Sequence, residues 1–153
     1  MKTDESETGS ARLRLQTSLD PNTSPLVLSD LSSDSDSYVR QNVAGNPGTS
    51  QETLTELAED EKYFVRRDVA ENPNTPIEVL VKLARDGWEE VRVEVAGNRR
   101  TPVEILISLS KDPYVSVRQA LFRNPNTPIE IRRHAFDGLG PGDSAGDDDF
   151  YDD

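Results

Sequence analysis

Aspartate and arginine recur together in this 153-residue sequence, and such pairs could bind phosphate or support acid–base chemistry. Each arginine follows an aspartate by six residues, and the pair returns every 26 residues. A catalytic site occurs once in a chain, whereas stacked repeats need the same contact in every unit. We therefore interpret this Asp/Arg ladder as structural, each aspartate pairing with an arginine of its own or a neighbouring repeat. Its members are Asp34, Asp60, Asp86, Asp112, Arg40, Arg66, Arg92 and Arg118.

The other residues capable of chemistry form no recognisable catalytic or metal-binding motif. His134 is the only histidine, and the chain has no cysteine, so a catalytic triad or a thiolate metal site has no components. Glu89 and Glu90 are adjacent on a predicted turn and cannot face each other across a substrate. The segment 34–38 begins like a calcium loop but lacks the later ligands, the glycine and the final glutamate. We expect no enzymatic activity, no metal and no cofactor.

Aromatic side chains that the apolar periodicity does not place inward are the stronger functional signal. They cluster before or at the start of the second helix of each repeat, and others lie in the acidic C-terminal tail. Aromatic residues with nearby arginines are typical anchors of protein interfaces, although rings could instead fill gaps between units. The candidate partner-binding residues are Tyr38, Tyr63, Phe64, Trp88, Tyr114, Phe150 and Tyr151, with Arg99, Arg100 and Arg123.

These residues sit on a tandem repeat whose period is 26, which covers residues 12–136 in about five units. The unit begins a helix at Thr75-Pro76-Ile77-Glu78, which reads as a capping box with threonine as the N-cap. Within that helix Ile77, Leu80, Leu83 and Ala84 form one apolar stripe.

The second helix of the unit is predicted to be shorter, over 91–96, and either 3₁₀ or irregular α. Asn-Pro ends it in three copies, because a residue before proline is pushed out of the α region. A pair of helices this small has no interior of its own and must stack on its neighbours. The sequence thus predicts an all-α protein, a right-handed α-solenoid of two-helix repeats.

The repeat resembles the leucine-rich repeat variant family, in which an α-helix alternates with a short 3₁₀-like helix. The residues that carry the resemblance in one unit are Val65-Arg66, Val69-Ala70, Asn72-Pro73, Thr75-Pro76, Glu78, Leu80, Leu83-Ala84 and Asp86. The spacing of the Asp/Arg ladder is also similar to that of HEAT repeats, which implies a fuller second helix. Both resemblances imply an interaction surface and name no partner.

Most of the net charge of −12 belongs to the two ends of the chain. Residues 1–11 are acidic and polar, and residues 137–153 contain seven aspartates and no base, so both are predicted to be disordered. Within the solenoid the charge changes from acidic units at the start to a last unit, 116–136, with a net charge of +3. The acidic tail could fold back on this basic end, reach a basic partner, or simply aid solubility.

Taken together, the sequence favours a non-catalytic scaffold that binds a protein or peptide on the solenoid surface. The alternative is a role connected with nucleic acid, through a basic HEAT-like face or an acidic tail that imitates DNA. A HEAT-like base-excision enzyme ranks third, and direct nucleic-acid binding is not expected because the aspartates occupy the arginines. No signal segment or apolar run of membrane length is present, so we expect a soluble cytoplasmic protein without membrane contact.

Overall fold

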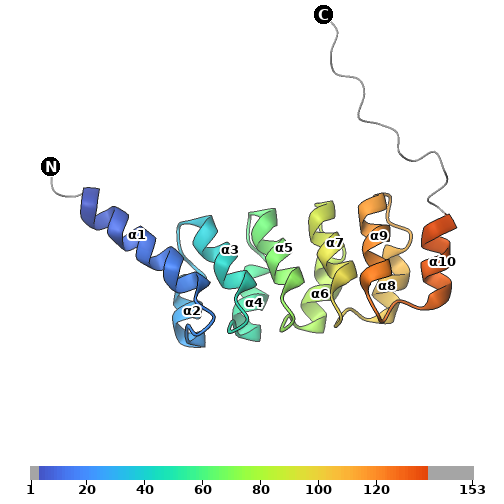
Figure 1. Ribbon diagram of the computed structural model, residues 1–153, viewed down its shortest axis with the longest axis horizontal. Coiled ribbons are helices and arrows are strands. Elements are labelled where there is room, and N and C mark those ends of the chain that lie inside the picture. Colours follow the sequence, from blue (N-terminus) through green and yellow to red (C-terminus); the bar gives the residue numbers. More distant parts are fainter. Residues whose placement is uncertain (1–3, 138–153) are drawn as a thin grey trace, which may run out of the picture.

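The computed structural model describes the backbone of residues 4–137 and the side chains of residues 9–133. This part of the chain forms ten α-helices and no strand, in two alternating types (Figure 1). The A helices are α2 (Pro25–Leu31), α4 (Gln51–Leu57), α6 (Ile77–Leu83), α8 (Val103–Leu109) and α10 (Ile129–Asp137). The B helices are α1 (Asp4–Leu19), α3 (Ser37–Gly45), α5 (Tyr63–Glu71), α7 (Glu89–Gly97) and α9 (Val115–Arg123).

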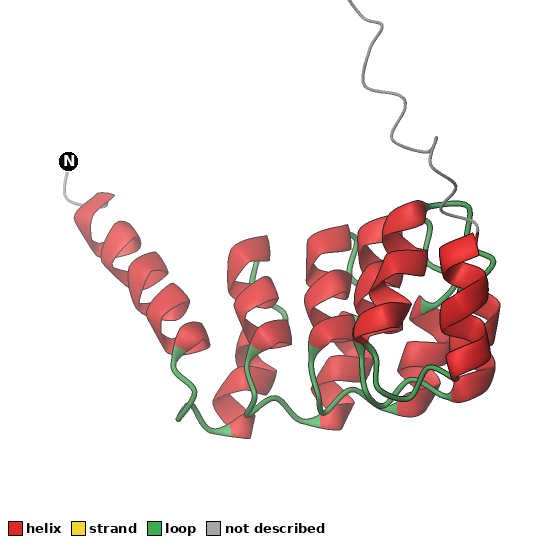
Figure 2. Cartoon of the chain, turned by 45° about the vertical axis from the view of Figure 1, so that its right-hand side comes forward, coloured by secondary structure: helices red, strands yellow, loops and turns green. Residues whose placement is uncertain are grey.

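The B helices stand side by side in one row along an elongated array, and each A helix packs against the B helices beside it (Figures 1 and 2). Each unit is one B helix followed by one A helix, which gives five units between Asp4 and Asp137. The predicted all-α solenoid with a period of 26 residues is therefore confirmed. Consecutive units stack, so every unit depends on its neighbours for burial.

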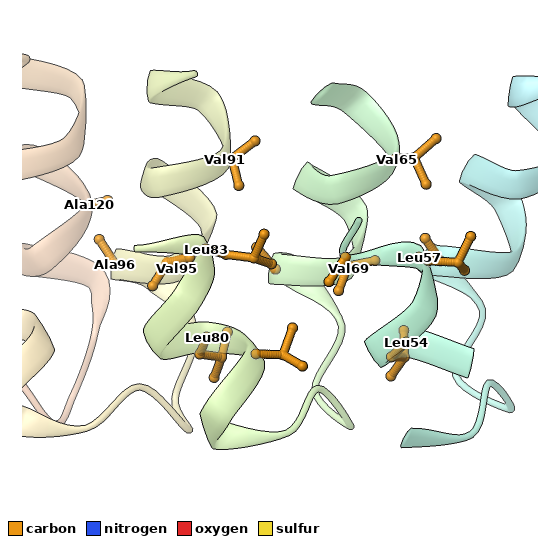
Figure 3. Close-up of a cluster of buried hydrophobic side chains, with 14 of the residues drawn as sticks. Leu54, Leu57, Val65, Val69, Leu80, Leu83, Val91, Val95, Ala96 and Ala120 are labelled. Carbon is orange, nitrogen blue, oxygen red and sulfur yellow. The ribbon is translucent and has the colours of Figure 1, made fainter. Parts of the chain in front are cut away.

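One continuous apolar core runs through the array, supplied in turn by the two helix types (Figure 3). Leu54 and Leu80 come from A helices, and Val65 and Val69 come from the B helix between them; all four are fully buried. The predicted stripe of α6 is correct for Leu80 and Leu83, but Ile77 is 43% exposed and Val79 is buried instead. Ile77 is the first helical residue, so its side chain lies at the end of the helix rather than over the core.

The second helix of the repeat is α, one of the two forms expected, but the expectation that it is the shorter helix is wrong. The B helices α3, α5, α7 and α9 are α-helices of nine residues, while the A helices α2, α4, α6 and α8 have seven. Prediction from apolar residues found only 91–96, because the ends of α7 are Glu89, Glu90 and Gly97, which carry no apolar signal. The fuller second helix that the HEAT resemblance implied is the one observed.

The predicted capping box is also wrong. Pro76 is the N-cap of α6 and makes no side-chain cap bond, and Pro102 is its equivalent in α8. The Thr75 hydroxyl instead donates to the Val69 carbonyl near the end of α5, at 2.5 Å. This carbonyl also accepts from the Asn72 amide at 3.2 Å, so the threonine hydroxyl is a second donor that holds the end of α5. True side-chain caps occur where serine stands in place of the proline: Ser24 and Ser50 accept from the amides of Val27 and Thr53.

Replacing Glu78 with alanine tests whether this side chain caps α6. The side chain is exposed and caps nothing, so the free energy of unfolding should change by less than about 0.5 kcal/mol. The matched Ser50→Ala variant, which removes a real cap, should lose about 1 kcal/mol. Urea unfolding of both variants measures the difference. A loss of unfolding free energy well above about 0.5 kcal/mol for Glu78→Ala would show that Glu78 does cap the helix.

The N-terminal segment differs from its predicted disorder. Residues 4–11 continue α1, which runs unbroken over 16 residues. Once the end of α1 is held against α3, each further helical residue adds a hydrogen bond without a new nucleation cost. The acidic residues of the first turn also suit the positive end of the helix dipole. The predicted C-terminal tail lies, from 138 onwards, outside the described residues.

Candidate interaction surface

The Asp/Arg ladder joins consecutive units along the edge of the array where the B helices begin. Arg66 in α5 donates from Nε and Nη2 to the two carboxylate oxygens of Asp86, at 2.7 and 3.0 Å. Its Nη1 donates to the backbone carbonyl of Asp60, in the turn before α5, at 2.6 Å. Arg40 donates to Asp60, and Arg92 donates to Asp112, from the same two atoms, Nε and Nη2. Each guanidinium therefore connects its own turn to the turn of the next unit.

The ladder carboxylates are shielded from solvent and held in the charged form. Burial raises the pKa of Asp86, but the hydrogen bonds from Arg66 and from the Trp88 amide outweigh it and set that pKa below its ordinary value. The pKa values of Asp60 and Asp112 are lowered by the same balance. The hydrogen bond to Asp86 in turn raises the pKa of Arg66. These charged groups form ion pairs with one another, so they are not exposed to solvent as a binding site.

A second ladder, of buried asparagines, runs along the opposite edge, where the B helices end. Asn72 donates from Nδ2 to the carbonyls of Ala44 and Asn46 in the preceding unit, at 2.7 and 3.0 Å. Its Oδ1 accepts from the backbone amide of Asn74 at 2.9 Å. The residues in equivalent positions make the same contacts; they are Asn46, Asn98 and Asn124.

From the sequence, we interpret these asparagines only as the residues before proline at which the second helix ends. Asn98 is followed by Arg99, yet the asparagine is kept although the proline is lost. A position that keeps asparagine without its proline indicates that the amide side chain itself is needed. That was the available signal for this ladder.

Beside the Asp/Arg ladder, aromatic side chains form a continuous row across unit boundaries. Tyr38 at the start of α3 stacks on Phe64 of α5, with ring centroids 5.9 Å apart. Phe64 meets Tyr63 edge to face at 5.8 Å, and Tyr63 stacks on Trp88 at 4.5 Å. We call these four residues the aromatic row. All four lie in the first turn of a B helix or just before it, beside the Asp/Arg ladder.

Both interpretations of the aromatic residues apply, each to different members. Tyr63 and Phe64 are half-buried and pack against the apolar core, so they fill the space between units. Tyr38 is 64% exposed and Trp88 is 52% exposed, so they remain available to a partner. Tyr114 is 52% exposed and lies against the guanidinium of Arg92, whose Cζ is 5.5 Å from the ring centroid.

The predicted arginines do not join the aromatic row. Arg99 and Arg100 lie in the turn after α7, at the opposite edge, where Arg100 donates to the Asn74 carbonyl at 3.3 Å. Arg123, in the last turn of α9, borders a hollow with Glu71 and Glu94. Burial, followed by repulsion from Glu71, raises the pKa of Glu94. Phe150 and Tyr151 lie outside the described residues, as does the side chain of His134.

Comparison with known families supports the repeat assignment for the unit in the middle of the array. Residues 63–87 match the family model of the leucine rich repeat variant. This leucine-rich repeat variant unit contains α5, α6 and the turn that carries Asp86, so the resemblance predicted from the sequence is confirmed there. Within the matched residues, Arg66 and Asn72 bind the neighbouring units, and Thr75 donates to the end of α5. No curated protein and no solved structure matches the chain.

Two further properties concern only the part of the chain that the structure describes. No group of three or more histidine, aspartate or glutamate side chains is arranged there to hold a metal ion. None of the helices between Asp4 and Asp137 is both long and apolar enough to cross a membrane.

Proposed function

We propose that this protein is a non-catalytic interaction scaffold that binds a protein or peptide through the aromatic row. The observation that carries the proposal is the continuity of the row over three consecutive units, with an exposed ring at each end. Leucine-rich repeat variant units support this class of function, since repeat arrays present extended surfaces to their partners.

The row suits protein recognition because its rings are fixed before a partner arrives. Tyr63 and Phe64 are held by the core, and each exposed ring stacks on one of them. The Asp/Arg ladder fixes the relative position of the helices that carry the rings. A preorganised aromatic surface loses little conformational entropy on binding, and aromatic residues dominate the hot spots of protein interfaces.

Charge around the row favours a protein over a nucleic acid. The ladder arginines nearest the rings, Arg40 and Arg66, already pair with aspartates and cannot neutralise phosphates. The exposed side chain of Glu90, two residues after Trp88, would repel a phosphate backbone, whereas Glu61 is paired with Lys62 beside Tyr63. An aromatic surface whose neighbouring ladder arginines are already paired therefore supports a polypeptide partner.

Replacing Trp88 with alanine is expected to reduce recovery of the specific partner from native-host lysate at least about 10-fold, as for an interface hot spot. The measurement is a tagged pull-down with the full chain at physiological salt, quantified against the unaltered protein. The control is Ile107→Ala, which removes a side chain that is 40% exposed on the A helix α8 and should leave recovery unchanged.

Trp88 is the only tryptophan, so its fluorescence reports the same contact directly. Adding the purified partner should shift its emission to shorter wavelength as the ring loses water. Equal recovery by both variants, or recovery of nuclease-sensitive nucleic acid alone, would contradict the proposal. Circular dichroism of Trp88→Ala, expected to match the parent, separates lost binding from lost folding.

A further inference from the structure

Within the part of the chain that the structure describes, the Asp/Arg ladder has no carboxylate for its last arginine, Arg118. Arg118 in α9 donates from Nη1 to the carbonyls of Asp112 and Pro113, at 2.7 and 3.1 Å, so its guanidinium is held in the turn like those of the earlier units. The residue 26 positions after Asp112 is Gly138, which has no side chain that could accept hydrogen bonds from Nε and Nη2 of Arg118. Among the side chains of residues 9–133, none forms an ion pair with Arg118.

Three earlier arginines of the ladder show which contact Arg118 does not make among the described residues. Arg40, Arg66 and Arg92 each present Nε and Nη2 as a fork that receives both oxygens of one aspartate. A planar guanidinium matches a carboxylate in this two-bond arrangement better than any other ligand of the chain. By equivalence with these arginines, the ligand that fits Nε and Nη2 of Arg118 is therefore a carboxylate.

The same end of the array has further unsatisfied polar atoms. Within the described part of the chain, Nε of Arg132 in α10 and Oγ1 of Thr127 before it are buried and have no hydrogen-bond partner. No B helix follows α9 between Val115 and Asp137, so only α10 covers it on the C-terminal side. With a net charge of +3 for residues 116–136, this end attracts an acidic segment.

We propose that Arg118 binds a side-chain carboxylate from the chain's own segment 138–153, which thereby completes the Asp/Arg ladder at the C-terminal end. The segment contains six aspartates and no base, and it follows directly after α10. Asp143 comes five residues after the vacant ladder position, a distance that an extended chain spans in about 17 Å. Because the segment is tethered beside its site, its effective concentration there is high.

A second copy of the chain is a poorer occupant of this site. In a head-to-tail stack the first unit of the next molecule would have to supply the ladder carboxylate. The position 26 residues before Asp34 is Thr8, which offers no carboxylate. The molecule's own tail is the occupant for which both charge and chain connection are present.

The test is the Nε–H signal of Arg118 in the ¹⁵N spectrum of the full chain at low salt, assigned by its disappearance in Arg118→Lys. The tail variant replaces Asp143, Asp147, Asp148 and Asp149 with asparagine and leaves every described residue unchanged. Its Arg118 signal should move away from the position in the parent protein, while the signals of Arg40, Arg66 and Arg92 stay in place. High salt should move the parent's Arg118 signal in the same direction, because salt screens an exposed pair.

Two controls make the outcome decisive. Neutralising the acids of the N-terminal segment, Asp4→Asn with Glu5→Gln and Glu7→Gln, should leave the Arg118 signal in place, which separates a specific contact from a change in net charge. A synthetic peptide of residues 138–153, added to the tail variant, should return the signal towards its original position. An Arg118 signal that is the same in the parent and the tail variant would overturn the proposal, and so would a signal that depends on protein concentration.

Discussion

Asn72→Ala is expected to lower the free energy of unfolding by about 3 kcal/mol, because it leaves the Ala44 carbonyl and the Asn74 amide without these partners, while the Asn46 carbonyl keeps only the Thr49 amide. The side chain donates to the carbonyls of Ala44 and Asn46 and accepts from the amide of Asn74. Asn72 is only 2% exposed, so water cannot replace these bonds without opening the array. Urea unfolding followed by circular dichroism measures the loss.

The matched control is Asn74→Ala, two residues later. Its Nδ2 also donates across the unit boundary, to the Pro47 carbonyl at 2.8 Å, but that contact is exposed to solvent. Its removal should cost less than about 1 kcal/mol, because water replaces the bond. If the two variants were equally stable, the asparagine ladder would not hold the units together.

The position of Asn72 at a unit boundary adds an expectation about cooperativity. Each unit of a stacked array contacts only its neighbours, so weakening one boundary separates the unfolding of the two sides. The Asn72→Ala variant should therefore show a smaller dependence of the unfolding free energy on urea. A substitution confined to one helix surface, such as Glu78→Ala, should leave that slope unchanged.

The repeat and its core were predictable because both depend on spacing alone. A period of 26 identifies Leu80, Leu83 and Val65 as core positions without knowledge of any partner, and all three are buried. The caps were not predictable in this way. Thr75 satisfies the capping-box pattern as well as it satisfies a contact with the Val69 carbonyl, and only the three-dimensional position of that carbonyl decides between them.

The aromatic residues show a similar limit at the candidate surface. Tyr63 and Phe64 are adjacent in sequence, and both prove half-buried, whereas Trp88 is 52% exposed. Which rings pack inward depends on where each B helix begins, and those boundaries lie in polar residues without an apolar period. The arginines at 99, 100 and 123 were grouped with the rings by composition, yet the B helix α7 separates Arg99 and Arg100 from the row by its length of about 13 Å.

The Asp/Arg ladder leads to the second large expected effect, on Asp86. Asp86→Ala leaves the guanidinium of Arg66 without a carboxylate, in a place where its side chain is 16% exposed, and should cost about 3 kcal/mol. The double variant Arg66→Met with Asp86→Ala should be more stable than Asp86→Ala alone, because it removes the uncompensated charge. The coupling free energy from this double-mutant cycle, measured by urea unfolding, gives the contribution of the pair.

The dependence on pH follows from the direction of the pKa shifts. Since the folded-state pKa values of Asp60, Asp86 and Asp112 lie below the ordinary value, their contribution to stability is complete above that value, about 4. It is lost as the pH falls through the lowered pKa values. The raised pKa of Glu94 acts in the opposite direction, because its protonation on acidification relieves the cost of its burial, but it is one group against three.

The parent protein should therefore lose stability as the pH falls below about 4, and the double variant, with one ladder pair fewer, should lose less over the same range. Thermal unfolding at a series of pH values measures both curves. Parallel curves would show that the Asp86–Arg66 pair does not contribute to acid sensitivity, and the ladder would then act through its backbone hydrogen bonds rather than through its charges. A difference that closes at high salt would instead indicate a pair more exposed than the 7% accessibility of the Asp86 side chain allows.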